Sequence, residues 1–183
     1  MKPRRPLVVV VTGSECTGKT TLARDLAKRH ETTWSPEFAR SYLESKGAPL
    51  TAADVLPVAR GQREAEDRAL AGARALTIRD TDLVSTVLYA RHYYGTCPRE
   101  VETAALERRG QLYLLCHPDV PWSQDGLQRD RGDRRDEMHS LFVTVLEEFG
   151  AEVVDIEGPW STRLVTALAA IDSRLAAADR RPG

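Results

Sequence analysis

The feature that most constrains this chain is the octapeptide at residues 13–20, which reads G-S-E-C-T-G-K-T and matches the pattern G-x-x-x-x-G-K-T. The run before it, residues 7–11, is short, apolar and rich in valine, which predicts a buried parallel strand. The run after it, residues 21–29, places Leu22 and Leu26 one helical turn apart. A strand, a glycine-containing turn and a helix in this order predict a phosphate-binding P-loop.

A P-loop binds phosphate mainly through its main chain. Glycines allow backbone conformations that other residues resist, and the N–H groups then point at the anion beside the positive end of a helix. Here Lys19 would reach the β- and γ-phosphates of ATP, and the Thr20 hydroxyl would ligate Mg²⁺. The residues expected to bind ATP are Gly13, Ser14, Glu15, Cys16, Thr17, Gly18, Lys19, Thr20 and Thr21.

The length and charge of the chain limit its possible partners. Its 183 residues predict one domain over 1–183, with flexible ends at 1–6 and 179–183. The net charge of −1 gives no electrostatic reason to expect nucleic acid or an anionic membrane as a partner. No run approaches the roughly 20 apolar residues of a membrane span, and no signal peptide is evident. We therefore expect a cytoplasmic protein. The sequence does not indicate an oligomeric state.

The three cysteines, Cys16, Cys97 and Cys116, are odd in number and widely spaced, so they predict neither a disulfide framework nor a metal site. Cys116 ends an apolar run and is expected in the core. Cys16 lies within the P-loop, where oxidation or alkylation would block ATP binding. The alternative is that Cys16 is simply a small residue that the loop tolerates.

Short apolar runs alternate with segments of helical spacing along the chain. Strands are predicted at residues 7–12, 32–34, 75–80, 111–116 and 153–156. Helices are predicted from the P-loop to about residue 30 and at 37–46, 52–72, 83–94, 98–109, 136–149 and 160–178. Pro57 should kink or break the third helix. This alternation predicts an α/β P-loop NTPase with a five-stranded parallel sheet flanked by helices, as in nucleoside and nucleotide kinases.

Carboxylates follow the strands at the edge where ligands of parallel sheets bind. Asp80 ends its strand where a Walker-B-like aspartate would hold Mg²⁺ directly or through water. Asp82 would contact a substrate hydroxyl or, alternatively, cap the helix that begins at Leu83. Arg79 stands where an apolar residue is usual, so we expect its side chain to point outward or to pair locally.

Glu37 follows the second strand and is the candidate general base. Phosphoryl transfer to an alcohol needs a carboxylate within hydrogen-bond reach of the attacking hydroxyl. The alternative role of Glu37 is that of a first-turn acid favoured by the helix dipole. Arg40 lies three residues further on, on the same helix face, and would orient Glu37 or touch phosphate.

The polar loop at residues 117–135 carries the run R-D-R-G-D-R-R and is predicted to be an arginine-rich lid. The arginines of such a lid neutralise the transferring phosphoryl group and exclude water. The alternative is a solvated run whose charges compensate one another. Trp122 would stack on a substrate ring or, equally, anchor packing. The candidate lid arginines, in order of preference, are Arg129, Arg131, Arg134 and Arg135.

Several classes of nucleotide-binding protein fit the sequence poorly. Asn is absent, which excludes the N-K-x-D motif of GTPases, and the H-R-D and D-F-G motifs of protein kinases are missing. A motor or AAA-type ATPase usually has a longer chain and a second domain. The length, the lid and the strand-end acids favour a small-molecule kinase. The main alternative is a regulatory module that binds ATP without transferring phosphate, and it would need neither Glu37 nor the lid.

Five motifs occur in the order typical of one family, namely G-S-E-C-T-G-K-T-T-L, S-P-E-F-A-R, G-Q-R-E-A-E-D, R-D-T-D-L-V-S-T and W-S-Q-D-G-L-Q-R. With them the chain resembles the ribosylnicotinamide kinase domain of the bacterial NAD-salvage protein NadR and its stand-alone relatives. The resemblance runs over residues 8–156. The P-loop motif is generic, whereas D-T-D and W-x-x-D-G-L are far more specific.

The resemblance implies transfer of the γ-phosphoryl group of ATP to the 5′-hydroxyl of nicotinamide riboside, with Mg²⁺, which gives nicotinamide mononucleotide. It implies that Asp80 supports the metal, that Asp82 and Glu37 face the riboside, and that Glu37 is the base. The further residues implied are Asp125 and Arg129 in the lid, Trp122 over the nicotinamide ring, and Gly158, Pro159 and Trp160 beside adenine.

The chain departs from full-length NadR in three respects. Nothing precedes the kinase domain, so we expect neither an adenylyltransferase nor a DNA-binding half, and a reaction that stops at the mononucleotide. Arg79 and Cys16 are the other departures. They leave open a kinase for another nucleoside or small alcohol.

Overall fold

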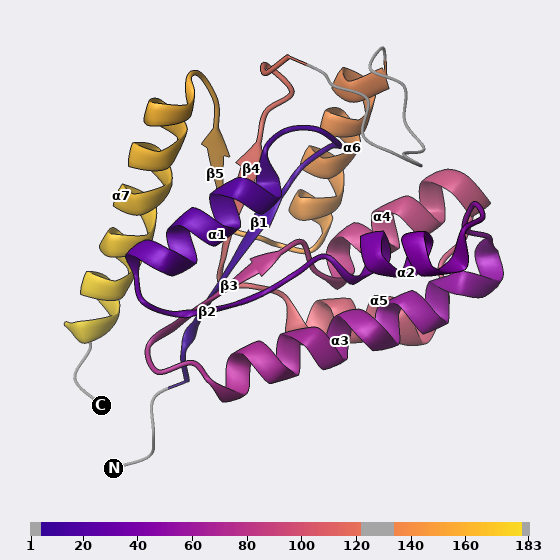
Figure 1. Ribbon diagram of the computed structural model, residues 1–183, viewed down its shortest axis with the longest axis horizontal. Helices are drawn as coiled ribbons and strands as arrows, with labels where there is room; N and C mark the ends of the chain where they lie inside the picture. The colour runs from indigo at the N-terminus through magenta and orange to yellow at the C-terminus, as the bar shows by residue number, and fades with distance from the viewer. Residues whose placement is uncertain (1–4, 122–133, 181–183) are drawn as a thin grey trace.

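The structure is a computed structural model, and it describes residues 5–121 and 134–180. Within these ranges five parallel strands form one sheet in the order β2-β3-β1-β4-β5 (Figure 1). This arrangement confirms the predicted fold class. The strands are β1 (Leu7–Thr12), β2 (Thr33–Ser35), β3 (Leu76–Asp80), β4 (Leu112–Cys116) and β5 (Val153–Ile156). The helices are α1 (Lys19–Arg29), α2 (Phe38–Lys46), the short 3₁₀ helix η1 (Ala52–Asp54), α3 (Val55–Ala71), α4 (Leu83–Tyr94), α5 (Arg99–Arg108), α6 (Arg135–Glu148) and α7 (Trp160–Asp179).

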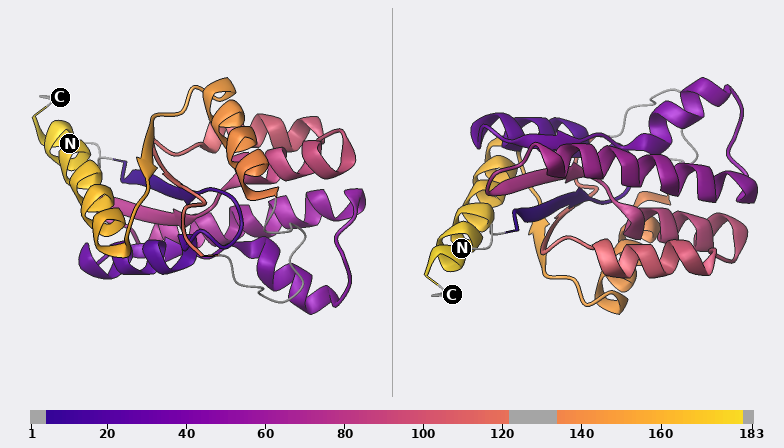
Figure 2. Two further views of the ribbon diagram at one scale, coloured as in Figure 1. Left: turned by 90° about the horizontal axis from the view of Figure 1, so that it is seen from above. Right: turned by 90° about the horizontal axis from the view of Figure 1, so that it is seen from below.

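The central strand β1 explains the two-layered core. Helices cover both faces of this strand, so its side chains are buried on either face. Its valines suit these positions, because they are apolar and favour strands. Val9 and Val11 pack with α1 and α7 on one face of the sheet. Val8 and Val10 pack with α3, α4, α5 and α6 on the other face. Figure 2 shows the sheet between these two helical layers.

The strand register brings four loops to one edge of the sheet. Val11 pairs with Asp80, and Thr12 pairs with Leu115. β5 continues this alignment, because Ile156 lies opposite Cys116. The loops that follow these strands therefore leave at the same edge, where parallel sheets bind their ligands.

The helices begin and end close to the predicted positions, and the main difference concerns Pro57. The segment predicted as one helix divides into η1 and α3, so the break precedes Pro57. Pro57 lies in the first turn of α3, where backbone N–H groups have no helical partner and a missing one costs little. Among the residues described, no helix is both long enough and apolar enough to cross a bilayer.

Arg79 corrects one expectation. Its side chain does not point outward, because β3 is buried along its whole length. It runs toward α3 and α5 instead, where it pairs with the Glu66 carboxylate at 3.2 Å and donates to the Arg108 carbonyl oxygen at 2.8 Å. Glu66 also lies 3.5 Å from the Arg108 guanidinium. A buried ion pair therefore links the middle of the sheet to its helical cover.

We expect Arg79→Met to lower the free energy of unfolding by about 3 kcal/mol near pH 8, because it leaves the Glu66 carboxylate buried with weaker compensation. Burial raises the pKa of Glu66 to about 7, and Arg79 opposes that rise. A raised native pKa favours the folded state at low pH, and this contribution is lost as pH rises through the native pKa. The deficit should therefore be clearly smaller near pH 5.5, as measured by urea unfolding.

The exposed Arg68→Met on α3, the helix that carries Glu66, is the matched control and should change the unfolding free energy by less than about 0.5 kcal/mol. The double variant Arg79→Met, Glu66→Gln removes both charges and should recover much of the loss. An equal deficit at both pH values, or no recovery in the double variant, would mean that the ion pair does not stabilise the fold.

Candidate functional site

The P-loop conformation depends on close packing against the end of β4. Gly13 has φ +134°, and a Cβ atom there would lie 2.6 Å from the Cys116 carbonyl oxygen. Only glycine fits this contact, because real Cβ atoms do not approach so closely. Gly18 has φ +83° and forms the N-cap of α1, and Cys16 also has a positive φ of 55°. Each glycine of the motif thus stands where the backbone has a positive φ, and at Gly13 a side chain would also clash with β4.

The first turn of α1 is suited to an anion. Its N-cap makes no side-chain hydrogen bond, and no acidic residue lies in the turn. Thr17 Oγ1 and Lys19 Nζ both donate to the Ser14 carbonyl oxygen, at 2.9 and 2.8 Å. The loop is therefore closed by its own side chains, while the helix dipole provides partial positive charge at its mouth.

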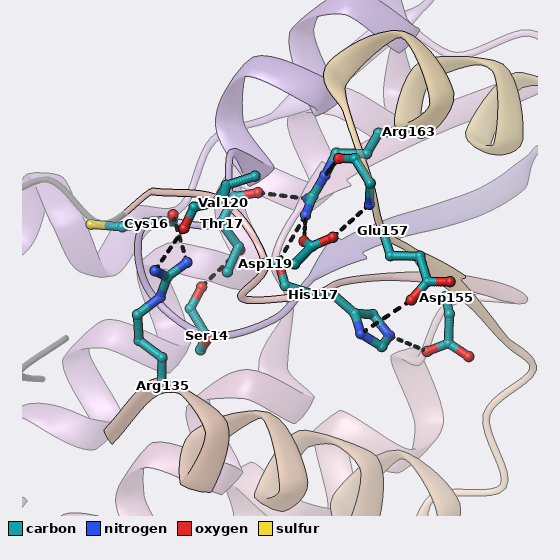
Figure 3. Close-up of polar contacts among 11 residues, drawn as sticks. Ser14, Cys16, Thr17, His117, Asp119, Val120, Arg135, Asp155, Glu157 and Arg163 are labelled. Carbon is teal, nitrogen blue, oxygen red and sulfur yellow. Dashed lines mark hydrogen bonds and ion pairs between the residues drawn. The ribbon is translucent and has the colours of Figure 1, made fainter. Parts of the chain in front are cut away.

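Arg163 of α7 holds the P-loop from behind, although sequence reasoning did not single it out. Its guanidinium is almost fully buried and donates to the Thr17 carbonyl oxygen at 3.1 Å (Figure 3). It also donates to the carbonyl oxygens of Gly158 at 2.8 Å and His117 at 3.0 Å, and it pairs with Asp119. One arginine thus connects the loops that follow β1, β4 and β5. No sequence pattern indicates that a single arginine on a helix binds three carbonyl groups.

Arg135 makes a second contact of this kind from α6. It donates to the Val120 carbonyl oxygen at 2.9 Å and to the Cys16 carbonyl oxygen at 3.3 Å (Figure 3). The sequence had placed it last among the lid arginines, and its buried position beside the P-loop makes it a support for that loop. Arg134, by contrast, is exposed and pairs with Glu137.

Asp80 lies beside the P-loop as predicted. The Thr20 hydroxyl donates to Asp80 Oδ2 at 2.6 Å, and Oδ1 is buried without a hydrogen-bond partner among the described residues. Burial raises the pKa of the Asp80 carboxyl, whereas the Thr20 hydrogen bond and the Lys19 ammonium lower it. Hydroxyl and carboxylate oxygens are the donors that Mg²⁺ prefers, and Mg²⁺ is usually held by one or two carboxylates together with phosphate and water. The residues present therefore fit this ion.

Glu37 is the N-cap residue of α2, with extended backbone angles of φ −66° and ψ 110°. It lines the same cavity as Lys19 and Arg40. Burial raises the pKa of its carboxyl, Lys19 lowers that pKa, Asp80 raises it and Arg40 lowers it again. The candidate base, the P-loop lysine and the candidate metal ligand are thus close enough to influence one another.

Asp82 is placed differently from the expectation that it faces a substrate. The residue is 2% exposed, and both carboxylate oxygens accept hydrogen bonds from the protein. Oδ1 accepts from the Val84 backbone N–H at 3.0 Å, which caps α4, and Oδ2 accepts from the Tyr113 hydroxyl at 2.6 Å. The alternative predicted from the sequence, a helix cap, is the role that the structure shows.

A cavity of about 280 Å³ opens beside the P-loop between α2, α3 and α4. Charged side chains lie at the end near the P-loop, and the rest of the lining mixes aromatic and aliphatic side chains with polar ones such as Glu44 and Asp54. The charged group includes Glu15, Lys19, Glu37 and Arg40, and the apolar group includes Leu43, Val55, Val58, Tyr89, Tyr93 and Tyr94. Tyr89 and Tyr94 also pack against the core cluster on this side of the sheet, so α4 separates the core from the cavity.

The remaining predicted residues divide into two groups. Trp160 begins α7 next to Gly158 and Pro159, and its ring lies 3.5 Å from where a Gly18 Cβ would stand. This segment therefore borders the P-loop, and its place beside adenine stays a prediction. Trp122, Asp125, Arg129 and Arg131 lie outside the described residues, so their roles stay predictions.

Comparison with known proteins shows which sequences and structures the chain is similar to. A family model described as "AAA domain" matches residues 8–163. The Trifunctional NAD biosynthesis/regulator protein NadR of Escherichia coli K12 is 32% identical over 163 residues, which cover 86% of this chain and 40% of NadR. The NadR protein of Salmonella typhimurium LT2 is 31% identical over the same shares. The chain thus spans less than half the length of these curated relatives.

Solved structures show the same likeness. NadR protein in complex with NR matches with a TM-score of 0.79 and 28% identity, over 92% of this chain and 51% of that one. NadR protein in complex with NAD and AMP-PNP matches with a TM-score of 0.76 and 27% identity, over 94% and 50%. Thymidylate kinase from Ehrlichia chaffeensis, with a TM-score of 0.64 and 12% identity over 93% and 100%, shows the shared fold alone.

These likenesses confirm the resemblance to NadR that the five motifs predict. The matching family model is described as an AAA domain although it covers a stretch as short as this chain, so chain length alone does not exclude that description. The chain belongs to the protein family described as an AAA domain.

Proposed function

We propose that this protein transfers the γ-phosphoryl group of ATP to the 5′-hydroxyl of nicotinamide riboside and releases nicotinamide mononucleotide. The observation that carries the proposal is the position of Glu37, which lines the same cavity as the P-loop lysine and a group of tyrosines. The NadR structures with NR and with AMP-PNP support it, because they match this chain over nearly its whole length.

The P-loop would hold the ATP phosphates on its main-chain amides and on Lys19, as the loop motif predicts. Thr20 and Asp80 would hold Mg²⁺, which would supply positive charge beside the phosphates of ATP. Trp160 would border adenine. Arg129 of the proposed lid would neutralise the transferring group, and Asp125 would belong to the same lid.

The acceptor would occupy the cavity, with its ribose hydroxyl at Glu37 and its ring among the tyrosines. Nicotinamide riboside carries a cationic pyridinium ring, and tyrosine faces attract cations through their negative quadrupole. Arg40 would orient Glu37 or contact phosphate, and Trp122 would cover the ring. The Glu37 carboxylate would accept the proton of the attacking hydroxyl. The reaction would take place in the cytoplasm, without nucleic acid or membrane.

Purified protein with Mg·ATP should release ADP in proportion to added nicotinamide riboside and form its 5′-phosphate, as followed by coupled ADP detection and mass spectrometry. A panel of other nucleosides tests the acceptor. ADP release that is equal with and without riboside would overturn the proposal, and turnover of a different nucleoside would reassign the acceptor while leaving kinase activity in place.

Glu37→Gln should lower kcat by about 10² to 10⁴-fold while the Kd for ATP stays within about threefold, because general bases contribute that much to a rate. Lys19→Ala should abolish turnover. The exposed Glu147→Gln is the matched control and should leave kcat unchanged. A Glu37→Gln enzyme that keeps kcat within about threefold would remove Glu37 as a base.

The pH dependence of kcat/KM should also reveal the titration of Glu37. Burial raises the pKa of Glu37 above its ordinary value of 4.5, so kcat/KM for the riboside should fall as pH drops through that raised pKa. Because a base works only when it is deprotonated, the loss lies on the acid side. The Glu37→Gln enzyme should lack this acid limb. An unchanged acid limb in that variant would assign the titration to another group.

A further inference from the structure

The dipeptide Gly61-Gln62 of α3 makes two contacts with the residue that follows the candidate base. A Cβ atom at Gly61 would lie 2.1 Å from the Phe38 ring, so the ring rests directly on the helix backbone. Gln62 Oε1 accepts a hydrogen bond from the Phe38 backbone N–H at 2.9 Å. The start of α2, and with it Glu37, is therefore held by both residues. They belong to the motif G-Q-R-E-A-E-D, to which the phosphoryl-transfer chemistry assigns no role.

The orientation of the Gln62 amide is fixed by its partners. Its Oε1 faces a backbone N–H, whereas its Nε2 lies 3.4 Å from Glu66 Oε1 and 3.5 Å from the Thr81 carbonyl oxygen. A donor on one side and two acceptors on the other allow only one arrangement of an amide. The side chain is 2% exposed, so water does not compete strongly for these bonds.

Each partner of Gln62 leads to a part of the site or of the core. Thr81 follows the candidate metal ligand and has φ +64°, a conformation that residues other than glycine rarely adopt. Glu66 is held in turn by Arg79 at 3.2 Å, within the sheet. One amide therefore connects the backbone beside Glu37 with the backbone beside Asp80.

Helix α2 depends on few other attachments. None of its residues is buried. Its C-terminal half is tied to Asp54 by the Tyr42 hydroxyl at 3.0 Å and by the Lys46 ammonium. Its N-terminal end is tied by the Phe38 contacts with Gly61 and Gln62. Loss of the Gln62 bond would leave this end free to shift, and a shift of about 1 Å at a reacting group can cost about 10²-fold in rate.

We propose that Gln62 is a positioning residue for Glu37. Gln62 holds the base beside the P-loop through its hydrogen bond from the Phe38 N–H, while the Phe38 ring packs on Gly61. The proposal rests on the proposed function for the identity of the base. Gln62 acts on the start of α2 and not on the acceptor, although its side chain also borders the cavity.

The test is a double-variant cycle between Gln62→Met and Glu37→Gln, with nicotinamide riboside and Mg·ATP as substrates. Methionine keeps the length of glutamine and removes its hydrogen bonds. We expect Gln62→Met to lower kcat at least tenfold with KM for ATP within about twofold, and to lower it less than threefold when Glu37 is already glutamine. The exposed Glu64→Gln on the same helix is the matched control and should leave kcat unchanged.

Equal losses in both backgrounds would show a merely structural role, and a raised KM for the riboside with unchanged kcat would show direct contact with the acceptor. Either result overturns the proposal. A ¹³C NMR titration of the Glu37 carboxyl, assigned by its absence in Glu37→Gln, supplies a readout that needs no acceptor. Gln62→Met should shift that titration, and an unshifted titration would refute positioning even if the riboside is not the substrate.

Discussion

The contact between Gly13 and the Cys116 carbonyl oxygen is the constraint on which the rest of the site depends. It seats the P-loop on the end of the neighbouring strand β4, so that α1 starts at a fixed distance from the sheet edge. A side chain at Gly13 would separate the two strands or push the loop outward. Arg163 and Arg135 strengthen this seat, because they bind the carbonyl oxygens of Thr17 and Cys16 from behind. The carbonyl groups are thus occupied on the protein side, and the helix start is left to attract an anion.

Much of the fold could be predicted because it depends on local pattern. The valines of β1, the glycines of the P-loop and the helical spacing of the later segments each act over a few residues, and their order specifies a parallel sheet. The positions of Asp80 and Glu37 could also be predicted, since Asp80 ends β3 and Glu37 follows β2 closely, and the carboxyl ends of parallel strands form the ligand edge. Sequence position alone was sufficient for these residues, whatever packs around them.

The failures concern residues whose role depends on distant partners. Asp82 is two positions from Asp80, but the positive φ of Thr81 redirects the chain, and Tyr113 on β4 supplies the donor that takes up its carboxylate. Arg79 was expected to point outward or to pair locally, because its partner Glu66, thirteen positions earlier in the chain on α3, cannot be recognised from spacing. Arg163 and Gln62 were missed for the same reason. Buried polar groups form hydrogen bonds with partners that the fold brings close, and no local sequence pattern identifies those partners.

The two halves of the site are held with unequal firmness. The phosphate-binding half lies between β1, β4 and two buried arginines, so its geometry follows from the core itself. The candidate base is the N-cap of α2, a helix that buries no residue. A short helix with few buried contacts opens more readily than a core element, and its side chains hold their place only through specific bonds at its ends. Substitutions around α2 should therefore alter the rate of transfer more than the affinity for nucleotide, because the rate depends on the position of Glu37 and the affinity depends on the P-loop.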